Sequence, residues 1–599
     1  MRQLSEFRSR ELANTAWAYA TLRYFDEPLL EALSSQSIRT IPLFNEKDLT
    51  ETAWSFATLR CLDRPLLQSI SAASIQTISE FGAAGLSNLA WSFATLCLPD
   101  RPLLHAIAAA AIPKMREFVP QGLSNTSWSF ATLAVEDPQL LDAIASASLP
   151  LLPEFNMQNL SNTAWAFAQL GYEDLPLMEA ISAASLNRIR EFSEQNVSNI
   201  AWSFATLGIR DQPLMDALSA ASLPMMSHFT VQGLANIAWA CAELGSVHTP
   251  LLDAISSSSI RTLGALPRGL GAPRDGEGPK AVLSLAQALA ASGALQDDTY
   301  ASVVACLERY SGGMDGPEES SEPLTSSDFG GEGAAFEDSL EPRVIKELPD
   351  VCVLWKPPGW TVTVSDELAQ LDAPPGPASP GRPLQDWVAE ALGSSRPVAR
   401  DAKAQFGLVH RLDINTSGAL VCATTYRGYH LAQLQFTARR TRKIYVCLCH
   451  GSLPLAPVKI DAPLRFARRA DGLWRSAAEP SGKPSLTELL AAGHLTVEGE
   501  AMSLVRLRLH TGRQHQIRAH LANLGHPLAA DGLYGGRAAA RCERCFLHAE
   551  RLSLDVGAGP VDAISPLPSD LRAALAAAEA PEGRARALAR DLLGEVRAP

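Results

Sequence analysis

The stretch Gly407-Leu-Val-His-Arg-Leu-Asp-Ile-Asn-Thr-Ser-Gly-Ala-Leu420 places a single carboxylate, Asp413, between a short apolar run and a polar turn. The apolar run Ala419 to Ala423, which follows the turn, predicts a strand. Backbone held on both sides gives the carboxylate the rigid support that a catalytic group needs, and His410 and Arg411 bring donors beside it. The same residues fit a loop aspartate in a structural ion pair, because such pairs are common.

Further stretches in the same half of the chain support a catalytic role for Asp413. In chain order they are Asp350-Val-Cys-Val-Leu-Trp-Lys-Pro-Pro-Gly359, Arg442-Lys-Ile-Tyr-Val-Cys-Leu-Cys-His-Gly451, Thr511-Gly-Arg-Gln-His-Gln-Ile-Arg-Ala-His520 and Phe546-Leu-His-Ala549. Together with the His-Arg-Leu-Asp-x-x-Thr-Ser-Gly motif, they resemble the ordered motifs of the RluA-type pseudouridine synthases. The resemblance covers about 344 to 555, and it implies a mixed α/β domain around a largely antiparallel sheet.

The resemblance also assigns roles to three residues. It implies that Asp413 is the covalent partner in the reaction, a role open to a carboxylate. It implies that Tyr445 packs against the uracil and takes part in proton removal. It implies that Arg518, in Gln-Ile-Arg, pairs with the catalytic carboxylate, and such pairing keeps a carboxylate ionised at neutral pH.

A second set of residues is expected to contact RNA. By the resemblance, Arg411 holds the target nucleotide after it has left its stack, which the chemistry requires. Lys443 closes a basic run at the end of a helix expected over His430 to Thr441; this run fits a phosphate patch or a solvated helix end equally well. The RNA-contact candidates are His410, Arg411, Arg513, His515 and Lys443.

Length and composition set the broad class. A chain of 599 residues is too long for one core, so at least two domains are expected. No run of 18 apolar residues occurs, so no membrane span is expected. The ten scattered cysteines favour reduced thiols in an intracellular compartment. The first twenty residues carry both charges and already belong to a repeat, so we expect no targeting peptide there.

Charge is spread unevenly along the chain. Residues 1 to 265 hold 15 Lys+Arg and 25 Asp+Glu, a balance of −10, whereas residues 343 to 555 hold 27 and 19, a balance of +8. The segment with the catalytic motif is therefore the basic one. This fits a polyanionic substrate, because phosphate neutralisation drives most such binding.

The first 250 residues repeat with a period of 37, marked by seven tryptophans from Trp17 to Trp239 and by a phenylalanine ten residues before each. Such a period predicts a solenoid of stacked helix pairs, since one pair alone cannot bury its apolar face. We expect the tryptophans and phenylalanines to form the core. The residue three before each tryptophan is an asparagine in six of the seven units and Glu51 in the second. We expect this asparagine to act as a cap or as an inter-repeat hydrogen bond.

These units resemble octotricopeptide-type repeats, which are known from organelle RNA-binding proteins. The resemblance implies RNA binding and an organelle, either chloroplast or mitochondrion. The array is acidic and its units are nearly identical, whereas a base-reading array should vary at its contact positions. A protein partner therefore stays an alternative to RNA.

The domain boundaries follow from these patterns. We expect a helical solenoid over 1–265, degenerate capping helices over 266–310, a disordered acidic linker over 311–342, the catalytic domain over 343–555 and an Ala-rich helical tail over 556–599.

Together these patterns predict an RNA pseudouridine synthase with an appended solenoid that targets it to RNA or to a protein. The alternative is a non-catalytic RNA-binding or processing factor that keeps the synthase fold as a scaffold. No cofactor is expected, because isomerisation needs no redox step, phosphate donor or metal. Cys542 and Cys545 form a single Cys-x-x-Cys motif. A zinc site needs four ligands, so we expect no zinc site there. The sequence leaves open which RNA (ribosomal, transfer or messenger) and which uridine are modified.

Overall fold

The computed structural model describes residues 6–246, 248–266, 277–312, 314, 340–362, 382–455, 458–469, 471–539, 541–557, 559–580 and 583–594. The described chain divides into two compact units. The first holds residues 1–265 and 291–299, and the second holds residues 266–290 and 300–599. No helix in the described ranges is long and apolar enough to cross a membrane. Most of the acidic segment expected as a linker, residues 315–339, lies outside the described residues.

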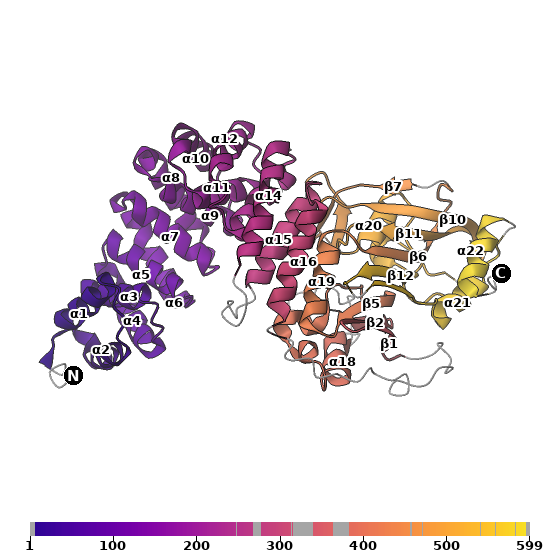
Figure 1. Cartoon of the computed structure of the whole chain (residues 1–599), viewed down its shortest axis with the longest axis horizontal. Helices are drawn as coiled ribbons and strands as arrows, with labels where there is room; N and C mark the ends of the chain where they lie inside the picture. The colour runs from indigo at the N-terminus through magenta and orange to yellow at the C-terminus, as the bar shows by residue number, and fades with distance from the viewer. Residues whose placement is uncertain are drawn as a thin grey trace. The chain divides into compact units, whose positions relative to one another are not determined.

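The first unit is a solenoid of helix pairs, which confirms the fold expected from the 37-residue period (Figure 1). The first helices of the pairs are α1 (Ser9–Thr21), α3 (Glu46–Thr58), α5 (Ala83–Thr95), α7 (Pro120–Thr132), α9 (Met157–Gln169), α11 (Glu194–Thr206) and α13 (Val231–Leu244). The second helices are α2 (Glu27–Thr40), α4 (Arg64–Thr77), α6 (Arg101–Ala111), α8 (Pro138–Leu151), α10 (Leu175–Arg188), α12 (Gln212–Ser222) and α14 (Thr249–Ala265). Short 3₁₀ turns end α2, α4, α6, α8, α10 and α12.

Helix caps repeat with the same period as the helices. An aspartate precedes each helix from α2 to α12 in the second set, and its side chain accepts a hydrogen bond from the backbone N–H three residues on. A proline stands in the first turn of each of these helices, where its missing N–H costs nothing. An aspartate cap with a proline one or two residues later therefore marks the start of each second helix from α2 to α12.

The phenylalanines form the core as expected, but the tryptophans do not. Phe81 and Phe155 are fully buried, whereas Trp17 is 47% exposed and the six later tryptophans are all partly exposed. The first helices approach one another through Ala and Ser, and a close approach through small residues leaves no space for an indole. The prediction of a tryptophan core was wrong.

The role expected for the asparagines was also wrong. Inter-repeat hydrogen bonds run from Asn159 Nδ2 to Ser124 Oγ and from Asn196 Nδ2 to Ser161 Oγ, both at 2.9 Å. These donors lie six residues before the tryptophan, not three. A side chain six residues before the tryptophan faces the neighbouring repeat. A side chain three residues before the tryptophan lies on the same solvent-facing side of the helix as the tryptophan itself.

Two further helices, α15 (Glu277–Ala291) and α16 (Asp297–Ser311), fall in the range expected to cap the solenoid. Most of their residues group with the second unit. From α16, Glu308 binds Arg427, Tyr300 accepts from Gln435 at 2.5 Å and Ser311 lies 2.9 Å from His430. All three partners lie on α19 (Tyr426–Thr437), so α16 covers that helix.

The second unit is built on a nine-stranded mixed sheet, as expected. Its strand order is β1-β2-β5-β12-β6-β11-β10-β7, with β13 beside β12, and only the β5–β12 pair is parallel. The strands are β1 (Arg343–Glu347), β2 (Val351–Lys356), β5 (Ser417–Ala423), β6 (Arg442–His450), β7 (Val458–Ile460), β10 (Thr487–Val497), β11 (Glu500–Leu509), β12 (Leu547–Asp555) and β13 (Pro560–Ile564). Two small sheets pair β3 (Trp360–Thr361) with β4 (Arg382–Pro383) and β8 (Leu464–Arg468) with β9 (Trp474–Ala478).

Helices cover this sheet and complete its two cores. On one side α18 (Leu384–Ala391) and α20 (Gln516–Asn523) pack on β2, β5, β6 and β11 through Leu384, Val388 and Ile517. On the other side α21 (Ser569–Ala576) and α22 (Arg584–Leu593), drawn in yellow in Figure 1, pack on β6, β10 and β11. Helix α19 starts four residues earlier than expected and ends before Arg439, so Lys443 lies on β6.

Candidate active site

A cavity of about 670 Å³ opens beside the loop that carries Asp413. All eight candidate residues line it: His410, Arg411, Asp413, Lys443, Tyr445, Arg513, His515 and Arg518. They come from the loop before β5, from β6, from the loop after β11 and from α20. The sequence separates these segments by up to a hundred residues, and the sheet order β5-β12-β6-β11 brings them to one place.

The Asp413 loop is held by a buried lysine. Lys356, at the end of β2, is fully buried, and its Nζ donates to the carbonyls of Pro357, Ile414 and Thr416 at 3.0, 3.1 and 2.8 Å. Gly359 N donates to the carbonyl of Ile414 at 2.8 Å. These bonds fix the backbone on the C-terminal side of Asp413. The Lys-Pro-Pro-Gly motif therefore holds the Asp413 loop in place. The motif was expected from the sequence, but this role of Lys356 was not.

Arg518 pairs with two carboxylates. Its Nη1 lies 3.5 Å from Asp413 Oδ2, while its Nε and Nη2 bind Asp531 at 2.8 and 2.6 Å. Asp531 is almost fully buried, so the bidentate pair is the tighter of the two. Burial acts to lower the pKa of Arg518, but its hydrogen bonds to Asp531 and the charge of Asp413 outweigh burial and raise the pKa. Sequence reasoning missed Asp531, although Asp-Gly-Leu-Tyr-Gly follows the Arg518 motif closely.

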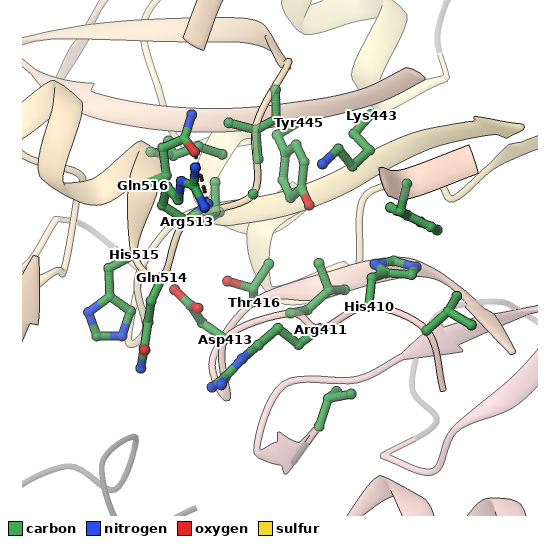
Figure 2. Close-up of a pocket in the computed structure, with 18 of the residues that line it drawn as sticks. His410, Arg411, Asp413, Thr416, Lys443, Tyr445, Arg513, Gln514, His515 and Gln516 are labelled. Atoms are coloured by element: carbon green, nitrogen blue, oxygen red, sulfur yellow. Dashed lines mark hydrogen bonds between the residues drawn. The ribbon is translucent and has the colours of Figure 1, made fainter. Parts of the chain in front are cut away.

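Tyr445 faces Asp413 from the opposite side of the cavity (Figure 2). The tyrosine projects from β6 and is 7% exposed. Burial, with a smaller contribution from the Asp413 charge, raises the pKa of Tyr445, so the ring carries a neutral phenol at neutral pH. A neutral, buried phenol favours packing and hydrogen-bond donation over the role of proton acceptor.

Lys443 lies two residues before Tyr445 on β6, so both side chains point to the same face of the sheet. Burial lowers the pKa of Lys443 to about 8. Its Nζ lies 5.7 Å from the centre of the Phe436 ring. The structure therefore places Lys443 in the cavity. It does not lie in the basic run at a helix end that the sequence predicted.

His410 is held as a neutral ring. Its Nε2 accepts a hydrogen bond from Val421 N at 2.9 Å, and its ring stacks on Phe436 with centroids 4.5 Å apart. Burial, reinforced by the nearby Lys443 charge, lowers the pKa of His410 to about 3. His410 thus ties the catalytic loop to β5.

The loop before α20 is fixed by one buried amide. Gln516 Oε1 accepts from Thr511 Oγ1 and Arg513 N at 2.7 and 3.0 Å, and its Nε2 donates to Leu486 O and Thr487 Oγ1, both at 3.0 Å. His515, next to it, adopts a left-handed backbone with φ of 53°. Non-glycine residues in that region are uncommon and cluster at functional sites. His515 Nδ1 lies 3.1 Å from the Tyr534 hydroxyl, and the histidine lines the cavity edge in Figure 2.

No group of three His, Cys, Asp or Glu side chains that could hold a metal ion occurs among the described residues. Cys542 and Cys545 are both buried, and Cys542 Sγ lies 3.1 Å from the carbonyl of Arg544. The polar groups that line the cavity, between apolar side chains, include carboxylate, guanidinium, ammonium, phenol, imidazole, hydroxyl and amide groups. Such a set suits covalent and electrostatic chemistry on an anionic ligand.

Comparisons with known proteins match both parts of the chain. Residues 350–523 match the model of the RNA pseudouridylate synthase family, and residues 1–250 match that of the RNA-editing substrate-binding complex 6 protein. A solved human protein, RNA Pseudouridylate Synthase Domain Containing 1, is 25% identical and covers 44% of this chain and 97% of its own, with a TM-score of 0.32.

Curated relatives are similar to the catalytic unit. An uncharacterized RNA pseudouridine synthase of Chloroflexus aurantiacus is 37% identical over 200 residues, which are 33% of this chain and 61% of the relative. The chain spans 53% to 61% of the length of the first four curated relatives it matches. The dual-specificity RNA pseudouridine synthase RluA of Vibrio parahaemolyticus is 35% identical over 32% of this chain and 77% of its own length. On this coverage and identity, the chain belongs to the RNA pseudouridine synthase family.

Proposed function

We propose that the chain isomerises uridine to pseudouridine in RNA. The observation that carries the proposal is the convergence of Asp413, Arg518 and Tyr445 on one cavity, with Arg518 Nη1 3.5 Å from Asp413 Oδ2. A scaffold that only binds RNA has no chemical need for all three. The basic balance of residues 343 to 555 supports an RNA substrate.

In this proposal the target uridine leaves its stack and enters the cavity, because a stacked base is out of reach. Asp413 forms a bond to the nucleotide as the glycosidic C–N bond breaks, and this bond breaks again when, after the uracil has turned, a C–C bond to the sugar forms. The new carbon then loses its proton to solvent and the freed ring nitrogen takes one up, so the base returns to its neutral aromatic form. Arg518 holds Asp413 ionised, Tyr445 packs on the uracil and Arg411 keeps the nucleotide out of the helix. The repeat array directs the enzyme to its RNA or to a partner.

The test maps pseudouridine in ribosomal, transfer and messenger RNA incubated with pure full-length chain, and in parallel with Asp413→Asn. The exchange keeps the size of the side chain and removes its nucleophilic charge. We expect new pseudouridine with the wild type and none with the variant, while RNA binding by the variant stays near that of the wild type. Binding without any modification by either protein would favour the alternative, a non-catalytic factor built on the same fold.

A further inference from the structure

A row of asparagines and tryptophans follows the first helices of four consecutive repeats, which succeed one another in Figure 1. We call it the amide–indole row. It consists of Asn88 and Trp91 on α5, Asn125 and Trp128 on α7, Asn162 and Trp165 on α9, and Asn199 and Trp202 on α11. Away from the ends of these helices, only the row residues are partly exposed and the other side chains are buried. The array therefore presents the same two groups once per repeat.

The polar groups of this row are unused. Within the described part of the chain, the side-chain amides of its four asparagines have no hydrogen-bond partner. The neighbouring inter-repeat amides, Asn159 and Asn196, are by contrast buried and bonded. A partly exposed amide can both donate and accept, which are the two functions of a peptide backbone. Since the amide recurs without variation, it suits a polymer whose backbone also recurs.

The row carries no cation. The sequences of α5, α7, α9, α11 and α13 contain no Lys or Arg, and they contain the acidic residues Glu194 and Glu243. RNA affinity depends on neutralising phosphates, so this face opposes RNA. The balance of −10 over residues 1 to 265 favours a basic ligand instead. Tryptophan faces also attract Lys and Arg, and they cover the aliphatic stems of those side chains.

Trp165 and Trp202 are packed too closely to hold a base between them. The ring centroids of Trp165 and Trp202 lie 6.4 Å apart with planes tilted by 33°. A ring inserted between two others needs roughly 7 Å, twice the contact distance of about 3.5 Å. An extended chain needs no such gap, because it lies across the rings.

We propose that the amide–indole row binds an extended, basic polypeptide segment of another protein. The asparagine amides bond the backbone of the segment, and the indoles cover its Lys and Arg stems. Packed helices lie about 8–10 Å apart, so four of them span roughly 27 Å. Extended chain advances about 3.3 Å per residue, so the segment has about eight residues. This proposal stands on the array alone and does not depend on the catalytic activity.

The experiment selects binders of the full-length chain from a random 12-residue peptide library and measures their affinity by fluorescence anisotropy. The test variant is Asn125→Ala/Asn162→Ala/Asn199→Ala. The matched control, Gln76→Ala/Gln139→Ala/Asn187→Ala, removes three exposed amides from the second helices α4, α8 and α10. Both variants should melt within about 2 °C of the wild type, since the removed amides hold nothing within the described chain.

We expect selected peptides with net positive charge that lose at least tenfold in affinity with the row variant and less than twofold with the control. A labelled 12-nucleotide oligouridine should bind the wild type and the row variant equally. Peptides that bind both variants alike would overturn the proposal. Oligouridine affinity that falls tenfold with the row variant, without any peptide doing so, would also overturn it and assign the face to RNA.

Discussion

The two units of the molecule use the same amide group in opposite ways. In the catalytic unit, Gln516 is buried and its amide makes four hydrogen bonds. In the array, Asn125 and Asn162 are partly exposed and their amides bond nothing in the described chain. An amide whose hydrogen-bonding groups are all used fixes a loop before substrate arrives. An amide without hydrogen-bond partners can still bond a ligand. The buried amide thus indicates a preorganised site in the catalytic unit, and the exposed amides fit the recognition role proposed for the array.

The charges show the same contrast. Arg518 and Lys443 are half-buried in the cavity, beside two carboxylates and an aromatic ring respectively, while five of the first helices in the array contain no cation. The electrostatic attraction expected for RNA under the proposed function is therefore concentrated in the unit that carries the candidate active site.

Breaking the preorganised ion pairs should have the largest effect. Arg518→Met leaves Asp531, which is almost fully buried, without a cation, and breaking a buried pair costs about 3–5 kcal/mol. We expect turnover to fall by about 100-fold or more and the unfolding midpoint in urea to drop. The control is Arg537→Met, which breaks an exposed pair with Glu500 at 2.9 Å and should cost under about 1 kcal/mol. If the two variants retain equal turnover, Arg518 does not support Asp413.

The catalytic site was more accessible to sequence reasoning than the array surface. Asp413, Tyr445 and Arg518 lie in motifs whose spacing is fixed by strands, so the fold returns them to one cavity. Lys356 and Asp531 stand in recognisable motifs, but their roles could not be predicted, because the carbonyls that Lys356 binds and the guanidinium that Asp531 binds come close only in the folded chain. In the array, periodicity predicted the solenoid correctly, yet it could not separate a buried aromatic residue from an exposed one, because both recur every 37 residues.

The array offers a direct test of that distinction. Phe155 is fully buried and Trp165 is partly exposed, although both recur in every unit. Phe155→Ala should cost about 3–5 kcal/mol of unfolding free energy, and Trp165→Ala less than half of that. Urea titration followed by far-UV circular dichroism measures both, since the array supplies much of the helix. If Trp165→Ala lost more unfolding free energy than Phe155→Ala, Trp165 would be a core residue.

Lys443 predicts a pH dependence that the array should lack. The pKa of this lysine in the folded chain is about 8 and its ordinary value is 10.5, so its charge is lost as the pH rises through about 8. RNA affinity should therefore fall severalfold between pH 7 and pH 9.5. Since folding favours the neutral form, this group makes the fold more stable as the pH rises from about 8 toward 10.5. Lys443→Arg keeps its charge over this range and should flatten the affinity profile. An unchanged profile in that variant would exclude Lys443 as the cause.

Removing the array should have the smallest effect on chemistry. Helix α16 binds α19 through Tyr300, Glu308 and Ser311, so a fragment that starts at residue 277 keeps these contacts and one that starts at 340 loses them. We expect fragment 277–599 to modify a short RNA within about threefold of the full chain, because all the cavity residues and the basic balance remain. Fragment 340–599 should melt at a lower temperature, since it exposes the face of α19 that α16 covers. Turnover is measured on short and on full-length RNA for the full chain and for both fragments. The comparison separates the contribution of the array from that of α15 and α16. If fragment 277–599 lost turnover even on the short RNA, the array would contribute to catalysis itself, and the division between a preorganised site and a recognition surface would not hold.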